Sequence, residues 1–105
     1  MDNMLYIKEK NIKYCTTFFT RLKGMMFERE NRQNIYCFPN CKQIHTFFMY
    51  KNIDVIVTDK QNKIIKIIYD LKPNHIIKKA PNAFYIYEFD KGIITNKTYT
   101  RVTII

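Results

Sequence analysis

The chain of 105 residues contains only two glycines, two alanines and no tryptophan. Phosphate-binding loops of the Rossmann and P-loop types need several closely spaced glycines, so this scarcity argues against both kinds of nucleotide site. The shortage of alanine argues against a helical protein, because alanine is the strongest helix former. Isoleucine, phenylalanine and tyrosine supply most of the apolar side chains, and these residue types favour strands. The composition therefore predicts a mainly β protein.

Long apolar runs are also missing. No stretch approaches the ~20 consecutive apolar residues that span a membrane, and the first ten residues lack the apolar core of ~7–15 residues found in secretory signals. The three cysteines are an odd number, so they cannot all pair within the chain. We therefore expect a cytoplasmic protein with reduced thiols and no membrane partner.

Acidic residues are half as numerous as basic ones, 9 against 18, which gives a net charge of +9. Such a charge attracts polyanions and steers anionic partners toward the surface. The basic residues are spread along the chain and form no single run. An anionic partner such as a nucleic acid is therefore one interpretation, and a lysine-rich solvated surface is the other.

The length predicts a single domain over residues 1–105. A short helix is expected over residues 16–24, with Thr16 or Thr17 as its N-cap and Gly24 after its last turn. The polar residues 28–33 are expected to form an exposed loop. Residues 4–8 and 11–14 are extended pieces or a hairpin, and alternating apolar residues predict strands over 34–38, 44–49, 53–58, 63–68, 83–89 and 98–105. Short, mostly antiparallel strands of this kind predict a compact barrel or sandwich.

Cys37, Cys41 and His45 have the spacing C-x3-C-x3-H, and their residue types suit zinc. Residues four apart on a straight strand are separated by about 13 Å, so only a turn at Pro39-Asn40 could bring the two cysteines together. Small buried thiols and a hydrogen-bonded histidine are the alternative. Nucleophilic catalysis by Cys41, with His45 or His75 as its base, is a further interpretation. We assign no cofactor from this pattern.

Three carboxylates, Asp54, Glu88 and Asp90, lie in or beside apolar strand segments. A carboxylate in a strand core is costly unless it is paired or hydrogen-bonded, and Arg21 at the end of the expected helix is a candidate partner. A structural ion pair or a backbone clamp is one interpretation. The polar floor of a pocket, with one carboxyl of shifted pKa, is the other.

Three blocks of the sequence carry a resemblance to a known family. Residues 21–27, R-L-K-G-M-M-F, are similar to the pattern R-x-x-G-[LM]-M-[FY]. Residues 44–49, I-H-T-F-F-M, precede I-D at 53–54, and residues 83–92 fit A-x-x-x-x-E-x-x-x-G. In this order they span residues 15–105 and resemble the domain of unknown function 192 family. The loop before Asp54 is shorter than in many members, which read M-K-N-T-x-x-x-L-D.

The resemblance implies a compact, mainly β domain of barrel or sandwich type with one short helix, and it implies no established reaction, cofactor or partner. The matched positions are expected to meet in space, with Gly24 and Gly92 in backbone roles. We expect a non-enzymatic domain with a binding or structural role and a small-ligand pocket near His45. A hydrolase-like enzyme using His45 or a carboxylate is one alternative, and polyanion binding through the basic surface is another. The candidate ligand-binding residues are Arg21, His45, Phe48, Met49, Asp54 and Glu88.

Overall fold

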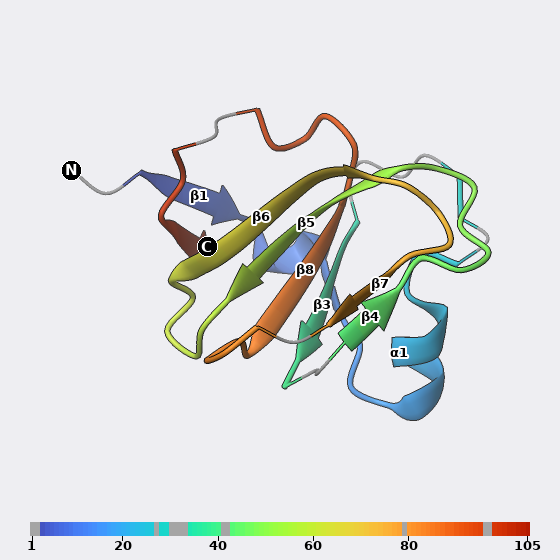
Figure 1. Cartoon of the computed structure of the whole chain (residues 1–105). Coiled ribbons are helices and arrows are strands. Elements are labelled where there is room, and N and C mark those ends of the chain that lie inside the picture. The colour runs from blue at the N-terminus through green and yellow to red at the C-terminus, as the bar shows by residue number, and fades with distance from the viewer. Residues whose placement is uncertain (1–2, 27, 30–33, 41–42, 79, 96–97) are drawn as a thin grey trace.

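A computed structural model describes residues 3–26, 28–29, 34–40, 43–78, 80–95 and 98–105. Within these residues the fold is mainly β, with one short α-helix, α1 (Phe18–Lys23), and a 3-10 turn, η1 (Glu9–Asn11). None of their helices is long and apolar enough to cross a membrane. The strands are β1 (Met4–Ile7), β2 (Ile12–Tyr14), β3 (Ile35–Pro39), β4 (Gln43–His45), β5 (Ile53–Thr58), β6 (Ile64–Leu71), β7 (Ile76–Lys78), β8 (Tyr85–Asp90) and β9 (Arg101–Ile104) (Figure 1).

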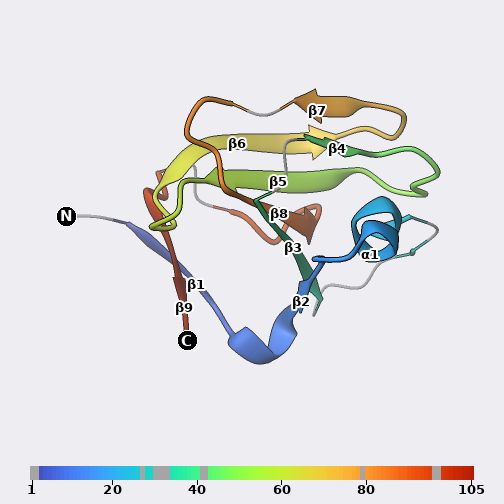
Figure 2. The same cartoon turned by 90° about the horizontal axis from the view of Figure 1, so that it is seen from below.

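A five-stranded sheet of order β2-β3-β8-β5-β6 forms the centre of the molecule. The pairs β3–β8, β8–β5 and β5–β6 are antiparallel, whereas β2 runs parallel to β3. The antiparallel pair β4–β7 lies on one side of this sheet together with α1, and the parallel pair β1–β9 lies on the other side (Figure 2). The predicted mainly β class with one short helix is confirmed, and the described sheets do not close into a barrel.

The two faces of the central sheet bury separate apolar cores. Strands β5 and β8 are buried along nearly their whole length, because successive side chains of a strand point to opposite faces and both faces are covered here. The first core, on the side of α1 and β4–β7, contains Cys15, Met25, Tyr36, Phe38, Ile44, Met49, Ile53, Val55, Val57, Leu71, Ala83 and Ile86. The second core, on the side of β1–β9, contains Ile7, Ile12, Ile35, Cys37, Ile56, Tyr87, Phe89, Ile94 and Val102.

The ends of α1 follow the local chemistry of the sequence. Thr17 is the N-cap, and its hydroxyl accepts the backbone N–H of Thr20 while the Thr20 hydroxyl accepts that of Thr17. This reciprocal pair satisfies two of the N–H groups that a helix start leaves without partners. Gly24 ends the helix with a φ of +43°, a backbone conformation that residues other than glycine rarely adopt. The predicted helix is therefore confirmed over the narrower range Phe18–Lys23, with Thr17 as its N-cap and Gly24 as its C-cap.

Of the two alternatives for residues 4–8 and 11–14, separate extended pieces are present and a hairpin is not, because β1 pairs with β9 and β2 with β3. Two other local predictions are wrong. The strand predicted over 44–49 ends at His45, since Phe48 has φ of +61° and lies in a turn. Alternation along residues 63–68 predicts Ile65 and Ile67 on one face and Ile64 and Ile68 on the other. A bulge in β6 instead leaves Ile65 exposed, and Ile64 and Ile67 both pack on the second core. Simple alternation fails there because a bulge adds one residue to a strand.

Asp54 is a backbone clamp that joins β5 to two turns. Its side chain is 2% exposed, Oδ1 accepts the backbone N–H of Asp70 at 2.8 Å and Oδ2 accepts that of Gly92 at 3.2 Å. Gly92 has φ of +91° in the turn after β8, which explains why glycine is used there. The carboxylate thus holds the end of β6 and the end of β8 beside the start of β5.

Replacing the buried Asp54 with alanine leaves the backbone N–H groups of Asp70 and Gly92 without their acceptor. Asp54→Ala is therefore expected to lower the free energy of unfolding by about 2–5 kcal/mol. Urea denaturation followed by circular dichroism measures this change. Glu9→Ala, which removes an exposed carboxylate bonded to Tyr14, serves as control and should cost less than about 1 kcal/mol. Equal losses in the two variants would contradict the clamp.

Candidate functional site

Glu88 lies in the middle of β8 and is 1% exposed, on the face of the first core. Tyr36 of β3 is its cross-strand neighbour. The segment that follows α1 crosses directly over its carboxyl, which accepts the backbone N–H of Met25. A Cβ atom on Gly24 would lie 3.2 Å from Glu88 Oε1 and 3.1 Å from Phe38 Cζ. The backbone approaches the carboxyl so closely that a side chain at position 24 would force Phe38 and Glu88 to shift.

Burial raises the pKa of Glu88 from its ordinary value of 4.5 to about 8. Repulsion from Glu28 acts in the same direction, whereas the Met25 N–H and the charge of Lys51 favour the ionised form and act against it. The carboxyl is therefore mostly protonated at neutral pH, which avoids the cost of a buried charge. Its Oε1 atom is buried and has no hydrogen-bond partner among the described residues.

Glu28 supplies a second carboxyl beside this segment. Its Oε1 atom accepts the Tyr36 hydroxyl and lies 3.3 Å from Lys23 Nζ. Its Oε2 atom is buried and accepts no hydrogen bond from the residues that the structure describes. Desolvation, together with this hydrogen bond, raises the pKa of Tyr36. The interpretation of Glu28 as part of an exposed polar loop is wrong, because its side chain is only 21% exposed; residues 30–33 of that loop lie outside the described residues.

A cavity of about 220 Å³ opens next to Glu28, between β2, α1 and β3. We call it the Glu28 pocket. Two of its lining residues are in contact: Lys13 Nζ lies 5.7 Å from the centroid of the Tyr36 ring. Gly24 forms part of its wall, and Glu88 is not among the lining residues but lies behind Gly24. The lining residues are Lys13, Tyr14, Cys15, Thr20, Lys23, Gly24, Glu28 and Tyr36.

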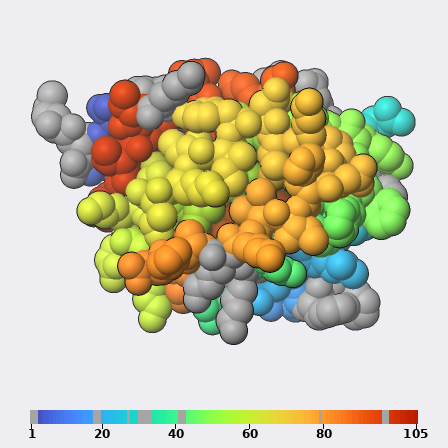
Figure 3. All heavy atoms as spheres, in the orientation of Figure 1, coloured from blue at the N-terminus to red at the C-terminus, as the bar shows by residue number. Residues whose placement is uncertain are grey.

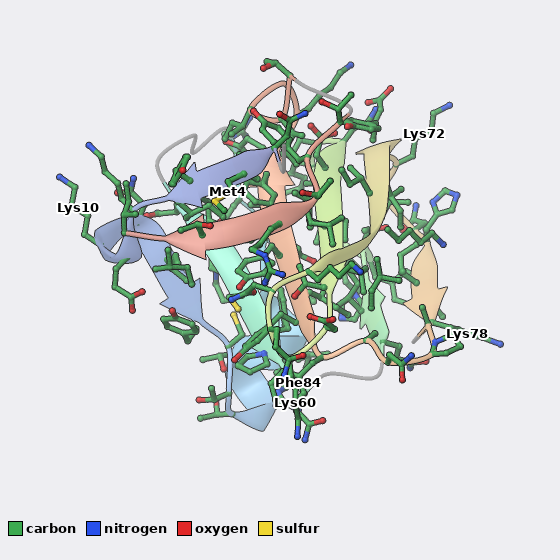
Figure 4. The ribbon with its side chains drawn as sticks, turned by 90° about the vertical axis from the view of Figure 1, so that its left-hand side faces the viewer. Met4, Lys10, Lys60, Lys72, Lys78 and Phe84 are labelled. Atoms are coloured by element: carbon green, nitrogen blue, oxygen red, sulfur yellow. The ribbon has the colours of Figure 1, made fainter. Side chains whose placement is uncertain are left out.

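A larger depression of about 530 Å³ is lined by Asn40, Asp59, Lys60, Gln61, Asn82, Ala83 and Phe84. Its polar groups have local tasks. Asp59 Oδ1 accepts the backbone N–H groups of Gln61 and Lys63 and so holds its own turn. Lys60 Nζ lies 5.4 Å from the centroid of the Phe84 ring, and the two side chains are adjacent in Figure 4. Unlike the Glu28 pocket, this depression has no buried carboxylate oxygen without a partner among its described lining residues.

Arg21, a candidate from the sequence, fixes α1 to its neighbours. Its Nε donates to the carbonyl of Cys15 at 3.2 Å, and Nη2 donates to that of Pro39 at 2.8 Å. These bonds attach the helix to the residue after β2 and to the end of β3. The suggested pairing of Arg21 with Asp54 or Glu88 is therefore replaced by bonds to backbone carbonyls.

His45 and the residues after it are not among those that line the Glu28 pocket. The ring of His45 stacks on Phe47 with 5.2 Å between centroids, and Nδ1 accepts the Phe47 N–H. Its Nε2 atom is buried without a partner among the described residues. Met49 belongs to the first core, whereas Phe48 is exposed. The structure thus brings Gly24 and Glu88 together and leaves His45 and Phe48 in other surroundings.

Thr46 is a residue whose role the sequence interpretation missed. Its side chain is fully buried. The hydroxyl donates a hydrogen bond to the carbonyl of Lys72 and accepts one from the N–H of His75, both at 2.8 Å. This bond pattern ties the segment after β4 to the loop between β6 and β7. The only sequence signal is a hydroxyl next to an aromatic pair, which does not identify a partner 26 residues away.

The zinc hypothesis finds no support in the described residues. Cys37 is fully buried and faces the second core, whereas β4, which carries His45, packs on the first. Burial raises the pKa of the Cys37 thiol to about 12, which disfavours the thiolate that zinc requires. Cys41 lies outside the described residues, and the described residues contain no group of three potential ligands that could hold a metal ion.

Two glycine variants separate steric crowding from backbone strain. Gly24→Ala places a Cβ against Phe38 and Glu88, so it should lower the free energy of unfolding by about 2–4 kcal/mol. Gly92→Ala introduces only an unfavourable positive φ at an exposed turn, and about 1 kcal/mol is expected. Chemical denaturation of both variants measures the difference. A Gly24→Ala variant that is no less stable than Gly92→Ala would contradict the close approach.

The raised pKa of Glu88 predicts a pH-dependent stability. Below about pH 4.5 the carboxyl is protonated in both the folded and the unfolded chain, and its stabilising contribution is complete. As the pH rises toward 8, the unfolded chain binds fewer protons than the folded one, so this contribution is lost. Glu88→Gln mimics the neutral form, so its stability should fall less than the parent's between pH 5 and 8. Denaturant titrations at several pH values test this, and parallel profiles would contradict it.

The sequence is similar to a known protein family and to a described protein. Residues 3–101 match the model of DUF192, described as Uncharacterized ACR, COG1430. UPF0127 protein PH1112 of Pyrococcus horikoshii is 29% identical over 89 residues, which cover 81% of this chain and 76% of that protein.

Two crystal structures share the fold. A protein of unknown function from Novosphingobium aromaticivorans gives a TM-score of 0.68 at 17% identity over 78% of this chain. The chain spans 64% of that protein's length. A Sinorhizobium meliloti protein, provisionally described as a transcription regulator, has a TM-score of 0.66 at 16% identity. The match covers 77% of this chain and 68% of that protein. At these identities the likeness concerns the fold alone, while the match over residues 3–101 places the chain in the uncharacterised DUF192 family.

Proposed function

We propose that the chain is a small ligand-binding domain and that its ligand occupies the Glu28 pocket. The observation that carries this proposal is the Oε2 atom of Glu28, which is buried without a hydrogen-bond partner among the described residues. A carboxylate oxygen that loses water without gaining a donor costs about 1–3 kcal/mol. A ligand with a hydroxyl or amino group would supply the donor that this oxygen needs.

The walls of the pocket suggest the remainder of the ligand. The rings of Tyr14 and Tyr36 and the buried Cys15 provide apolar surface, and at about 220 Å³ the space suits only a small molecule. Lys13 and Lys23 stand at its edge with exposed ammonium groups. The ligand is therefore a small, largely apolar molecule with one donor group for Glu28 and an acidic group that the lysines attract.

Binding is favoured over catalysis because of where the perturbed carboxyl lies. Glu88 has the raised pKa expected of a general acid, yet it is 1% exposed and lies behind the backbone of Gly24. A general acid must come within hydrogen-bond reach of its substrate. Glu88 instead holds Gly24 and Met25 in place, and Arg21 fixes the helix that forms another wall. These residues are positioning groups for the pocket.

A matched pair of probes tests the role of Glu28. 4-Hydroxybenzoate carries a hydroxyl donor that benzoate lacks, so it should bind more tightly to the parent chain and shift the amide signals of Thr20 and Gly24 in two-dimensional NMR spectra. Glu28→Gln puts an amide donor in place of an acceptor oxygen. This variant should bind 4-hydroxybenzoate at least about tenfold more weakly, because charge-assisted hydrogen bonds contribute ~1.5–3 kcal/mol.

The control is Asp70→Asn, which removes one negative charge from an exposed site and should leave binding of 4-hydroxybenzoate unchanged. Signals of Asn82, in the larger depression, should not move. The proposal fails if neither probe shifts Thr20 and Gly24, or if Glu28→Gln binds both probes as the parent does.

A further inference from the structure

A group of exposed aromatic rings lies on the segment between β4 and β5. Phe48 is 63% exposed, Tyr50 61% and Phe47 37%. Large apolar side chains in such proximity are usually buried against a core or a partner. These three rings belong neither to the first nor to the second core, and none of them lines the Glu28 pocket.

The backbone holds Phe48 outward at an energetic cost. Its φ of +61° lies in the left-handed region, which is unusual for a bulky residue. The anchors on either side explain how this conformation persists. Thr46 is bonded to Lys72 and His75, the N–H of Met49 donates to the Thr46 carbonyl at 3.3 Å, and Met49 is itself buried. Strained residues that are fixed in this way concentrate at functional sites.

Basic side chains lie beside Tyr50 and on the segment that anchors Thr46. The Arg29 guanidinium lies 5.7 Å from the centroid of the Tyr50 ring, a cation–π geometry. Lys91 lines a depression of about 350 Å³ together with Tyr50. Lys72, whose carbonyl accepts the Thr46 hydroxyl, is exposed and extends away from the body of the molecule (Figure 4). In the space-filling view, segments 46–50 in green and 72–76 in gold lie side by side at the same edge (Figure 3).

Acidic groups in this region are engaged by neighbours. Asp90 forms an ion pair with Lys51, and both side chains are mostly buried. The exposed Asp70 accepts the Asn52 amide at 2.8 Å and lies 3.3 Å from Lys91 Nζ. Among the described residues here, Arg29, Lys72 and Lys91 are exposed against the single exposed carboxylate of Asp70, so this surface keeps a positive net charge. We call the surface of Arg29, Phe47, Phe48, Tyr50, Lys72 and Lys91 the aromatic–basic surface.

We propose that the aromatic–basic surface binds single-stranded nucleic acid, with bases stacked on Phe48 and Tyr50 and phosphates paired with Arg29, Lys72 and Lys91. Exposed rings next to cations are the arrangement that binds single strands without base-specific hydrogen bonds. Duplexes hide the faces of their bases, so rings at an edge of the protein cannot stack on them. An acidic peptide would use the same charges but would not need rings held outward by a strained backbone.

Fluorescence anisotropy of the full chain with labelled oligothymidylate and oligouridylate tests the proposal, and the two oligonucleotides distinguish DNA from RNA. Phe48→Ala and Tyr50→Ala should each weaken binding about fivefold or more, since stacking contributes ~1–3 kcal/mol per base. Lys72→Gln should weaken binding and lower the slope of log affinity against log salt by about 0.7. The matched controls are Tyr6→Ala, which removes a ring 60% exposed on β1, and Lys10→Gln, at the opposite side of the molecule (Figure 4).

Both controls should bind within about twofold of the parent. The proposal is overturned if Tyr6→Ala loses as much affinity as Phe48→Ala, or if a duplex of equal length binds as tightly as the single strand. Displacement of the oligonucleotide by an equal concentration of a tyrosine–glutamate peptide would instead identify the surface as a site for acidic peptides.

Phe48→Gly separates function from stability. Glycine adopts a positive φ without strain, so this variant should have a melting temperature equal to or above that of the parent while its affinity for oligothymidylate falls as in Phe48→Ala. A lower melting temperature with unchanged affinity would show that Phe48 has a structural role only, and the proposal would fail. This result is independent of the Glu28 pocket, which contains none of these residues.

Discussion

The contact between the backbone of Gly24 and Met25 and the carboxyl of Glu88 is the constraint on which the arrangement of this domain depends. It joins the end of α1 to the central strand β8. Glycine permits the approach, and burial of the Met25 side chain in the first core holds it in place. The same contact sets the position of α1 relative to β2 and β3, and the Glu28 pocket lies between these elements. Burying Glu88 in this contact costs less free energy when its carboxyl is protonated than when it is ionised.

Charge is distributed unevenly between the interior and the surface. Asp54, Glu88 and Asp90 are buried, and each has a distinct solution to the cost of burial: two backbone N–H groups for Asp54, a raised pKa for Glu88 and an ion pair with Lys51 for Asp90. Because these acids are withdrawn from the surface, the exposed charge is more positive than the net charge of +9 suggests. This distribution supports both an acidic group in the pocket ligand and an anionic partner at the aromatic–basic surface.

Local sequence chemistry predicted those parts of the fold that local chemistry determines. Strand β5 begins and ends at the predicted residues 53 and 58, Thr17 and Gly24 cap the helix, and the clamp was one of the alternatives for Asp54. The roles of Glu28 and Thr46 could not be found in this way, since their partners Tyr36 and Lys72 are brought close only by the folded chain. The end of β4 at His45 has the same origin, because the anchors of Thr46 and Met49 override the strand preference of the aromatic residues between them.

The most direct test of the account is a pH titration of the Glu88 side chain, followed through its carboxyl carbon by NMR in ¹³C-labelled protein. The close contact with Gly24 and Met25 in a buried environment predicts a pKa near 8, well above the ordinary value of 4.5. A titration midpoint near 4.5 would show a solvated, ionised carboxyl and would contradict the packing on which the pocket depends.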